Sequence, residues 1–159
     1  MKHEQPTELF MPPNMLKARA GGGPGGIDLG AVKRAEQAME MLKSEFAGWL
    51  ADDVGVLLAA RARYAAAPDA GARAALLRAA HDIKGQAATF NCPLIARVAG
   101  SLSKMIGEVP ENAPLPAPLI DAHVNAIQVI HKQSLQDGNE LALALCKELE
   151  ARVDELLPK

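Results

Sequence analysis

The sequence predicts an all-α protein, an antiparallel four-helix bundle with an additional N-terminal helix. Hydrophobic residues make up 49% of the 159-residue chain, whereas aromatic residues make up only 3%. Alanine, which costs least in a helix, recurs throughout, and strands usually draw on valine, isoleucine, tyrosine and phenylalanine. In several segments apolar residues recur every three or four positions, as on one face of a helix. Short loops join these segments, so neighbouring helices should pack antiparallel.

Two regions are predicted, a flexible tail over residues 1–27 and a helical bundle over residues 28–157. The tail is rich in proline and glycine and ends near "GGGPGG". Its glycines satisfy the G-x-G-x-x-G pattern, but no convincing strand precedes them, so we interpret the segment as a linker and not as a phosphate-binding loop.

The first helix is expected to begin near Asp28, a good N-cap residue, and to end before Pro68. Gly48 and Gly55 weaken the middle of this segment, which therefore forms either one kinked helix or two helices. Its apolar stripe contains Leu29, Val32, Ala35, Met39, Leu42, Phe46, Leu50, Val54, Leu57, Leu58 and Tyr64.

Four further helices are expected along the chain. Asp69 should cap a helix that runs to about Phe90, and Pro93 should open the next, because proline suits the first helical turn. After the loop "GEVPENAPLPAP", a helix carries the stripe from Leu119 to Ile130. Asp137 and Gly138 then precede a last helix.

Composition and charge argue against several functions. The net charge of −2 shows no basic excess of the kind that nucleic-acid binders carry. No run of about 18 apolar residues predicts a membrane span, and no secretory signal is visible, so we expect a cytoplasmic protein. Cys92 and Cys146 are predicted to be reduced core residues. His123 and His131 lie about 12 Å apart along one helix, too far for one metal ion, so His123 is interpreted as a packing or surface residue.

The helix that contains "HDIKGQAATF" places a histidine away from its apolar stripe. Successive residues turn by about 100°, so the stripe of Leu76, Ile83, Ala87 and Phe90 lies opposite His81. On the side of His81 lie Arg78, Lys84, Gly85 and Ala88. His81 is therefore predicted to face solvent. Arg61, Arg63, Arg73 and Arg78 form a modest basic cluster, interpreted mainly as a solvated helix face, with electrostatic steering toward an acidic partner as the alternative.

Gly85 needs an explanation, because glycine inside a helix costs about 0.5–1 kcal/mol relative to alanine. We interpret it as a point of access, where the backbone of another protein approaches the imidazole. Lys84 supplies positive charge for an anion held there. A neutral imidazole is a nucleophile near pH 7, so an exposed histidine beside an ammonium group suits a phosphoryl group carried on nitrogen.

Residues 81–106, "HDIKGQAATFNCPLIARVAGSLSKMI", resemble the histidine-containing phosphotransfer (HPt) domain. The pattern is His-x-x-Lys-Gly, small residues, a turn and a second helix with regular leucines. The matching residues are His81, Lys84, Gly85, Ala87, Ala88, Leu94, Ala99 and Leu102. The family commonly has glycine where this chain has Asn91, and often serine or alanine at Gln86. A glutamine that some members place against the histidine corresponds to Ser103.

The resemblance implies a module of a bacterial-type two-component phosphorelay. His81 would accept a phosphoryl group from the aspartate of a receiver domain, or from a histidine kinase, and pass it on. Lys84 would stabilise phosphoryl charge, Gly85 would give the partner access, and Ser103, Arg78 and Ala88 would lie close by. The partner would supply Mg²⁺, and we expect no cofactor and no ATP-dependent kinase activity in the chain itself. The alternative is a helical adaptor that binds receiver domains without accepting phosphate.

Overall fold

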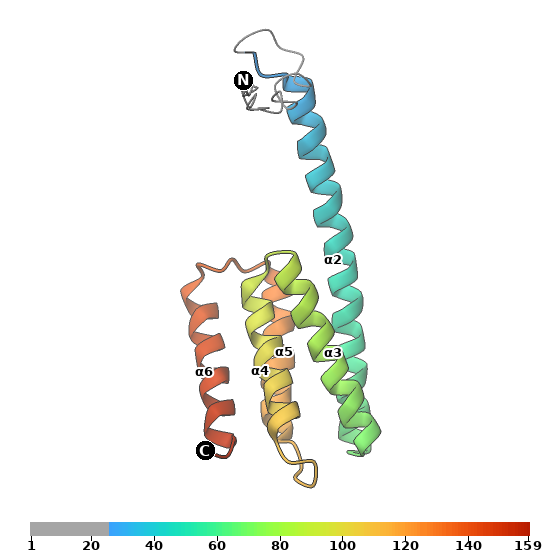
Figure 1. Cartoon of the computed structure of the whole chain (residues 1–159), viewed down its shortest axis with the longest axis vertical. Coiled ribbons are helices and arrows are strands. Elements are labelled where there is room, and N and C mark those ends of the chain that lie inside the picture. The colour runs from blue at the N-terminus through green and yellow to red at the C-terminus, as the bar shows by residue number, and fades with distance from the viewer. Residues whose placement is uncertain (1–25) are drawn as a thin grey trace, which may run out of the picture. The chain divides into compact units, whose positions relative to one another are not determined.

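The computed structural model describes residues 26–159, which contain five α-helices and no strand (Figure 1). The helices are α2 (Leu29–Ala66), α3 (Ala70–Thr89), α4 (Pro93–Glu108), α5 (Ala117–Gln133) and α6 (Glu140–Leu156). The prediction of an all-α helical bundle is therefore confirmed. Residues 1–25 of the predicted tail lie outside the described residues.

The described residues fall into two units, which divide within α2 after Glu45, so α2 contributes to both. In the first unit, the Asp28 carboxylate accepts hydrogen bonds from the backbone N–H groups of Gly30 and Ala31 at 2.9 and 3.3 Å, so the predicted N-cap is confirmed. Gly48 and Gly55 both lie within α2, which is one helix and not two. The site described below belongs to the second unit.

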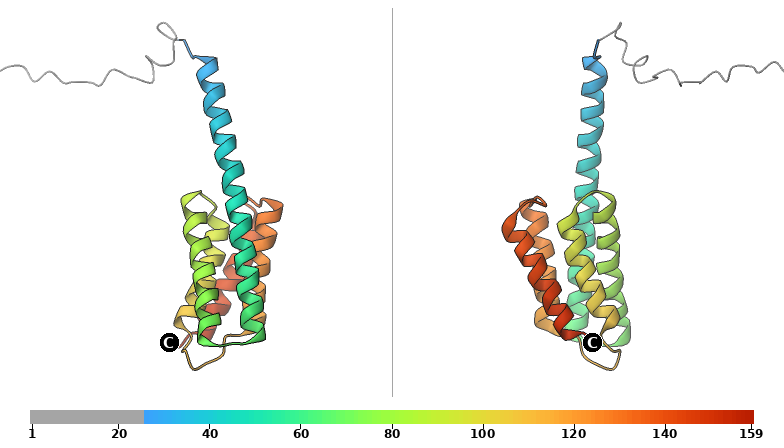
Figure 2. Two further views of the ribbon diagram at one scale, coloured as in Figure 1. Left: turned by 90° about the vertical axis from the view of Figure 1, so that its right-hand side faces the viewer. Right: turned by 60° about the vertical axis from the view of Figure 1, so that its left-hand side comes forward.

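Within the second unit, successive helices run in opposite directions (Figure 2). Helix α4 occupies a central position, because it packs against α3, α5 and α6. The residues of α2 from Phe46 onward join the same hydrophobic core. An ion pair of 2.7 Å between Arg61 and Asp121 connects α2 to α5.

The buried face of α3 matches its predicted stripe except at one end. Leu76, Ile83 and Ala87 are fully buried. Phe90 is 37% exposed, because it is the C-cap residue just beyond the helix, and its ring stacks on that of Phe46 with the centroids 4.3 Å apart. The prediction that Phe90 is buried with the rest of the stripe is therefore wrong, because Phe90 lies at the exposed edge of the core.

The turns at the two ends of α3 follow from local sequence. Asp69 caps the start of the helix by accepting a hydrogen bond of 2.7 Å from the Ala72 N–H. At the other end Asn91 has a φ of 56°, the left-handed conformation that a turn at a helix end requires and that asparagine tolerates. The Cys92 N–H donates to the Ala87 carbonyl at 2.7 Å, and Pro93 then begins α4. These contacts fix the turn that joins the histidine helix to α4.

The loop between α4 and α5 is held by a side chain that the sequence interpretation had assigned to a solvated face. The Arg73 guanidinium donates to the carbonyl of Ile106 at 2.7 Å and to those of Pro110 and Ala113 at 3.2 Å, and also to that of Val109. Arg73 therefore caps the C-terminal end of α4. That role depends on contacts between residues more than 30 positions apart, which a helical wheel does not reveal.

Candidate functional site

His81 lies exposed on α3 and lines a shallow cavity of about 430 Å³ between α3 and α2. The other lining residues from α3 are Asp82, Gly85, Gln86, Thr89 and Phe90, and α2 contributes Asp53. The core residues Ile83 and Ala87 lie on the opposite side of the same helix and are fully buried. The predicted orientation of His81 toward solvent is thus present in the structure.

Gly85 adjoins His81 in this cavity, and its missing side chain leaves the surface open. A Cβ atom built on Gly85 would meet no other atom within 4 Å. Packing inside the chain therefore does not require glycine here. The Gly85 carbonyl also accepts a hydrogen bond of 2.9 Å from the Thr89 hydroxyl. No packing contact within the described chain accounts for the cost of a glycine inside this helix. This agrees with the interpretation that Gly85 gives a partner access to His81.

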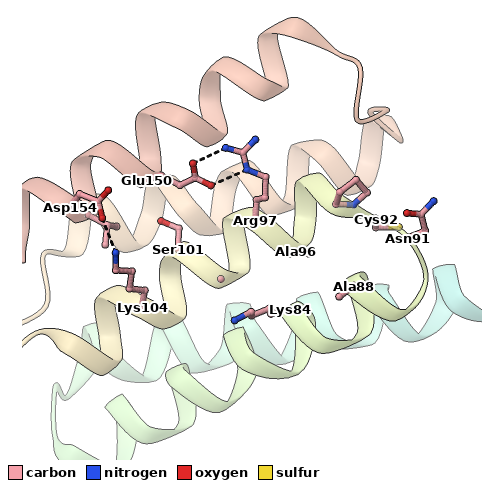
Figure 3. A pocket seen from close by; sticks show the side chains of 13 residues that line it. Lys84, Ala88, Asn91, Cys92, Ala96, Arg97, Ser101, Lys104, Glu150 and Asp154 are labelled. Atoms are coloured by element: carbon pink, nitrogen blue, oxygen red, sulfur yellow. Dashed lines mark hydrogen bonds and ion pairs between the residues drawn. The ribbon is translucent and has the colours of Figure 1, made fainter.

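Lys84 lies on the other side of the histidine helix, where it lines a second cavity of about 640 Å³ together with residues of α4 and α6 (Figure 3). A Cβ atom built on Gly100 would lie 3.6 Å from both Cδ and Cε of Lys84, so the lysine stem passes over Gly100. Ala88 lines the same cavity. The sequence had predicted that Lys84, Gly85 and Ala88 would surround His81, but in the structure only Gly85 shares its cavity.

Two ion pairs cross the second cavity from α4 to α6. The Lys104 ammonium lies 2.9 Å from the Asp154 carboxylate, and Arg97 makes two hydrogen bonds of 2.9 and 2.6 Å to Glu150 (Figure 3). Within residues 26–159 Lys84 makes no ion pair, so its charge is available to an anion.

The remaining predicted residues lie outside the cavity that contains His81. The Ser103 hydroxyl donates a hydrogen bond of 2.9 Å to the Ala99 carbonyl one turn back on its own helix, and Ser103 lines neither cavity. Arg78 is exposed one turn before His81 and also lines neither cavity. The structure therefore brings neither side chain to the cavity of His81.

Sequence reasoning gave no role to four polar residues of this cavity, which are Asp53, Asp82, Gln86 and Thr89. The Oδ2 atom of Asp53 and the Oε1 atom of Gln86 are buried without a hydrogen-bond partner. Burial raises the pKa of the Asp53 carboxyl, and the nearby charges of Asp82 and Asp52 raise it further. Gln86 stands where the family often has serine or alanine, and this departure is its only signal in the sequence. Asp53 carries no signal in the sequence, because its place depends on how α2 packs against α3.

His123 belongs to the core and to no surface site. It is completely buried; its Nε2 atom lies 2.9 Å from the Ser101 hydroxyl, and its Nδ1 atom lies 2.7 Å from the Leu119 carbonyl. The carbonyl can only accept, so Nδ1 carries the proton and Nε2 accepts from Ser101. Burial lowers the pKa of His123, which favours the neutral ring. In residues 26–159 no cluster of three or more histidine, cysteine, aspartate or glutamate side chains is arranged to hold a metal ion.

A comparison with protein-family models now identifies the class of protein that this fold and site define. The Hpt domain model matches residues 32–157, and the chain therefore belongs to the Hpt domain family. Domains of this family carry out histidine phosphotransfer in two-component phosphorelays, where they interact with receiver domains and histidine kinases. No match was found among curated proteins or among solved structures. None of the helices in residues 26–159 has the length and hydrophobicity of a membrane span.

Proposed function

We propose that His81 carries the phosphoryl group, accepting it from the aspartate of one receiver domain, or from a histidine kinase, and donating it to another receiver. The observation that supports this most strongly is the position of His81. It is exposed on a helix whose opposite face is fully buried, and beside it Gly85 leaves open surface. A partner can therefore approach the imidazole without any change in the core.

The transfer is an exchange of one bond for another. The Nε2 lone pair of His81 attacks the phosphorus of the phosphoaspartate, the N–P bond forms, and the P–O bond to the aspartate carboxylate breaks. The Nδ1–H of the neutral ring stays in place, so the ring becomes cationic as it takes up the phosphoryl group. The reverse reaction passes the group to the next receiver. Such chemistry depends mainly on positioning and charge stabilisation.

Lys84 is the residue that we assign to charge stabilisation. Its stem lies over Gly100 on the side of α4, away from the cavity of His81. A lysine side chain is long and flexible, and within residues 26–159 that of Lys84 makes no ion pair. We therefore expect its ammonium to swing toward the phosphoryl oxygens when a partner docks. The receiver supplies Mg²⁺, and the chain acts as a cytoplasmic phosphocarrier without ATP-dependent kinase activity.

The test is to incubate the purified chain with phosphorylated receiver domains and Mg²⁺ and to follow its intact mass. We expect a gain of one phosphoryl group that is lost in acid, as phosphohistidine is. His81→Gln should abolish the gain without lowering the melting temperature, because His81 is exposed. His131→Gln on α5 is the matched control and should still accept the group.

Two other results would contradict the proposal. If His81→Gln still gains an acid-labile phosphoryl group, another residue is the acceptor. If no receiver transfers its phosphoryl group while one of them still binds, the chain is an adaptor that does not accept phosphate.

A further inference from the structure

An exposed aromatic surface adjoins the cavity of His81 on the side of α2. Trp49 is 49% exposed and Val56 is 58% exposed, and Phe90 is exposed at the end of α3. The Trp49 and Phe90 rings meet edge to face with their centroids 6.1 Å apart. Phe90 also lines the cavity that contains His81, so this apolar surface is continuous with the proposed site.

Carboxylates lie among these apolar side chains. Trp49, Asp52, Asp53 and Val56 occupy one side of α2, within an arc of about 100°. Asp82 of α3 faces the same cavity as Asp53. We refer to Trp49, Asp52, Asp53, Val56, Asp82 and Phe90 together as the acidic–aromatic surface.

The charge of this surface is not compensated within the described chain. Asp52, Asp53 and Asp82 take part in no ion pair there. Burial raises the pKa of Asp53, and repulsion by Asp82 and Asp52 raises it further. One Asp53 oxygen is buried without a hydrogen-bond donor. Exposed aromatic rings beside unpaired carboxylates are complementary to a partner that brings both cations and apolar side chains.

The two sides of His81 therefore differ in charge. Toward α2 lie the carboxylates of Asp53 and Asp82, and toward α4 lies the ammonium of Lys84. A partner that placed its own acidic phosphoacceptor site over α2 would meet like charges. A partner that placed this acidic site toward Lys84 would meet an opposite charge. The rest of that partner's contact area would then lie on the acidic–aromatic surface.

We propose that the acidic–aromatic surface docks a segment of the receiver domain that carries arginine or lysine beside apolar side chains. This inference rests on the proposed phosphotransfer function. It adds two statements: on which side of His81 the receiver docks, and which side chains the receiver presents there. An arginine at this position would pair with Asp52 or Asp53 and stack on Trp49, a geometry that lysine reproduces less well. The carboxylates would speed association by attracting the basic segment.

The experiment measures both binding and transfer for charge-reversed variants. The probe is the receiver domain that binds the wild-type chain most tightly. Its phosphorylated form is used to measure transfer, and its unphosphorylated form is used for the dissociation constant. The test variant is Asp52→Lys with Asp82→Lys, since both side chains are exposed and unpaired in the described chain. The matched controls reverse two exposed carboxylates on α6, as Glu140→Lys with Glu155→Lys. Labelling of His81 by phosphoramidate, a small donor that releases ammonia, reports the reactivity of the imidazole without a partner.

We expect the test variant to bind the receiver and to accept its phosphoryl group at least about tenfold less efficiently, mainly through slower association. The control variant should stay within about twofold of the wild type. The wild-type association rate should fall as salt is added, and Trp49→Ala should weaken binding at every salt concentration. Labelling by phosphoramidate should not decrease in any variant, because a lysine in place of a carboxylate beside His81 attracts this anionic donor.

Unchanged or tighter receiver binding in the Asp52→Lys, Asp82→Lys variant would overturn the inference. An equal loss of phosphoramidate labelling would also overturn it, because the substitutions would then act on His81 and not on docking. Failure of the proposed function looks different, since the wild-type chain itself would bind the receiver without gaining a phosphoryl group. The binding measurement still tests the docking surface in that case.

Discussion

Replacing His123 with leucine should destabilise the protein most at neutral pH and progressively less as the pH falls. The wild-type ring is fully buried and bridges α4 to α5 through Ser101 and the Leu119 carbonyl. Leucine has a similar volume but leaves the Ser101 hydroxyl without its acceptor. The expected loss at pH 7 is about 1–3 kcal/mol, the usual cost of an unsatisfied buried polar group.

The pH dependence follows from the direction of the pKa shift. Burial lowers the pKa of His123 in the folded protein below its ordinary value of 6.5. At a pH between the folded and unfolded pKa values of His123, the unfolded chain binds more protons than the folded chain. The stability that the neutral ring contributes is therefore present above pH 6.5 and is lost as the pH falls toward the pKa of the folded state. The slope reaches about 1.4 kcal/mol per pH unit. The leucine variant lacks this component.

The assay is urea unfolding of both proteins at intervals from pH 7.5 to pH 5. The difference in unfolding free energy should shrink as the pH falls. A double-mutant cycle with Ser101→Ala should give a coupling of about 1 kcal/mol between the two side chains at pH 7.5. A difference that stays constant or grows toward pH 5 would refute the assignment of His123 as a buried neutral ring.

Three further substitutions give separate tests. Arg73→Met removes the donor to the Ile106 carbonyl of α4 and to three carbonyls that follow the helix, and it should cost about 2–4 kcal/mol in urea unfolding. A loss below about 0.5 kcal/mol would show that water replaces the guanidinium. Asp53→Asn should raise the melting temperature at pH 7, because the raised pKa means that the charged carboxylate destabilises the folded state. The gain should disappear near pH 3, where the carboxyl is protonated. A lower melting temperature at pH 7 would contradict this prediction. Gly85→Ala should stabilise α3 by about 0.5–1 kcal/mol, since no atom obstructs the new methyl group, yet slow transfer from a receiver; unchanged transfer would remove the access role of Gly85.

Local signals in the sequence were sufficient to predict much of the fold. Asp28 and Asp69 cap the helices that they were expected to cap, and Pro93 begins α4. Asn91 adopts the left-handed conformation that the turn requires. Each of these depends on contacts within about four residues, so position along the chain is enough to predict it.

The parts that could not be predicted depend on how the helices pack. A helical wheel correctly placed His81 opposite Ile83 and Ala87, but it grouped Lys84 with His81, whereas the lysine stem follows the groove beside Gly100 of α4. Asp53 meets the cavity of His81 only through the register of α2 against α3. The capping role of Arg73 likewise depends on a loop more than 30 residues away.

The central claim is that His81 Nε2 carries the phosphoryl group, and long-range ¹H–¹⁵N spectra of the chain test it most directly. The spectra are recorded before and after a phosphorylated receiver and Mg²⁺ are added. The account predicts that the Nε2 resonance of His81 alone shifts and shows coupling to phosphorus, while the signals of His123 and His131 stay in place. Coupling to phosphorus at a different histidine would contradict this account. So would the absence of such coupling at every histidine after the receiver has lost its phosphoryl group to the chain.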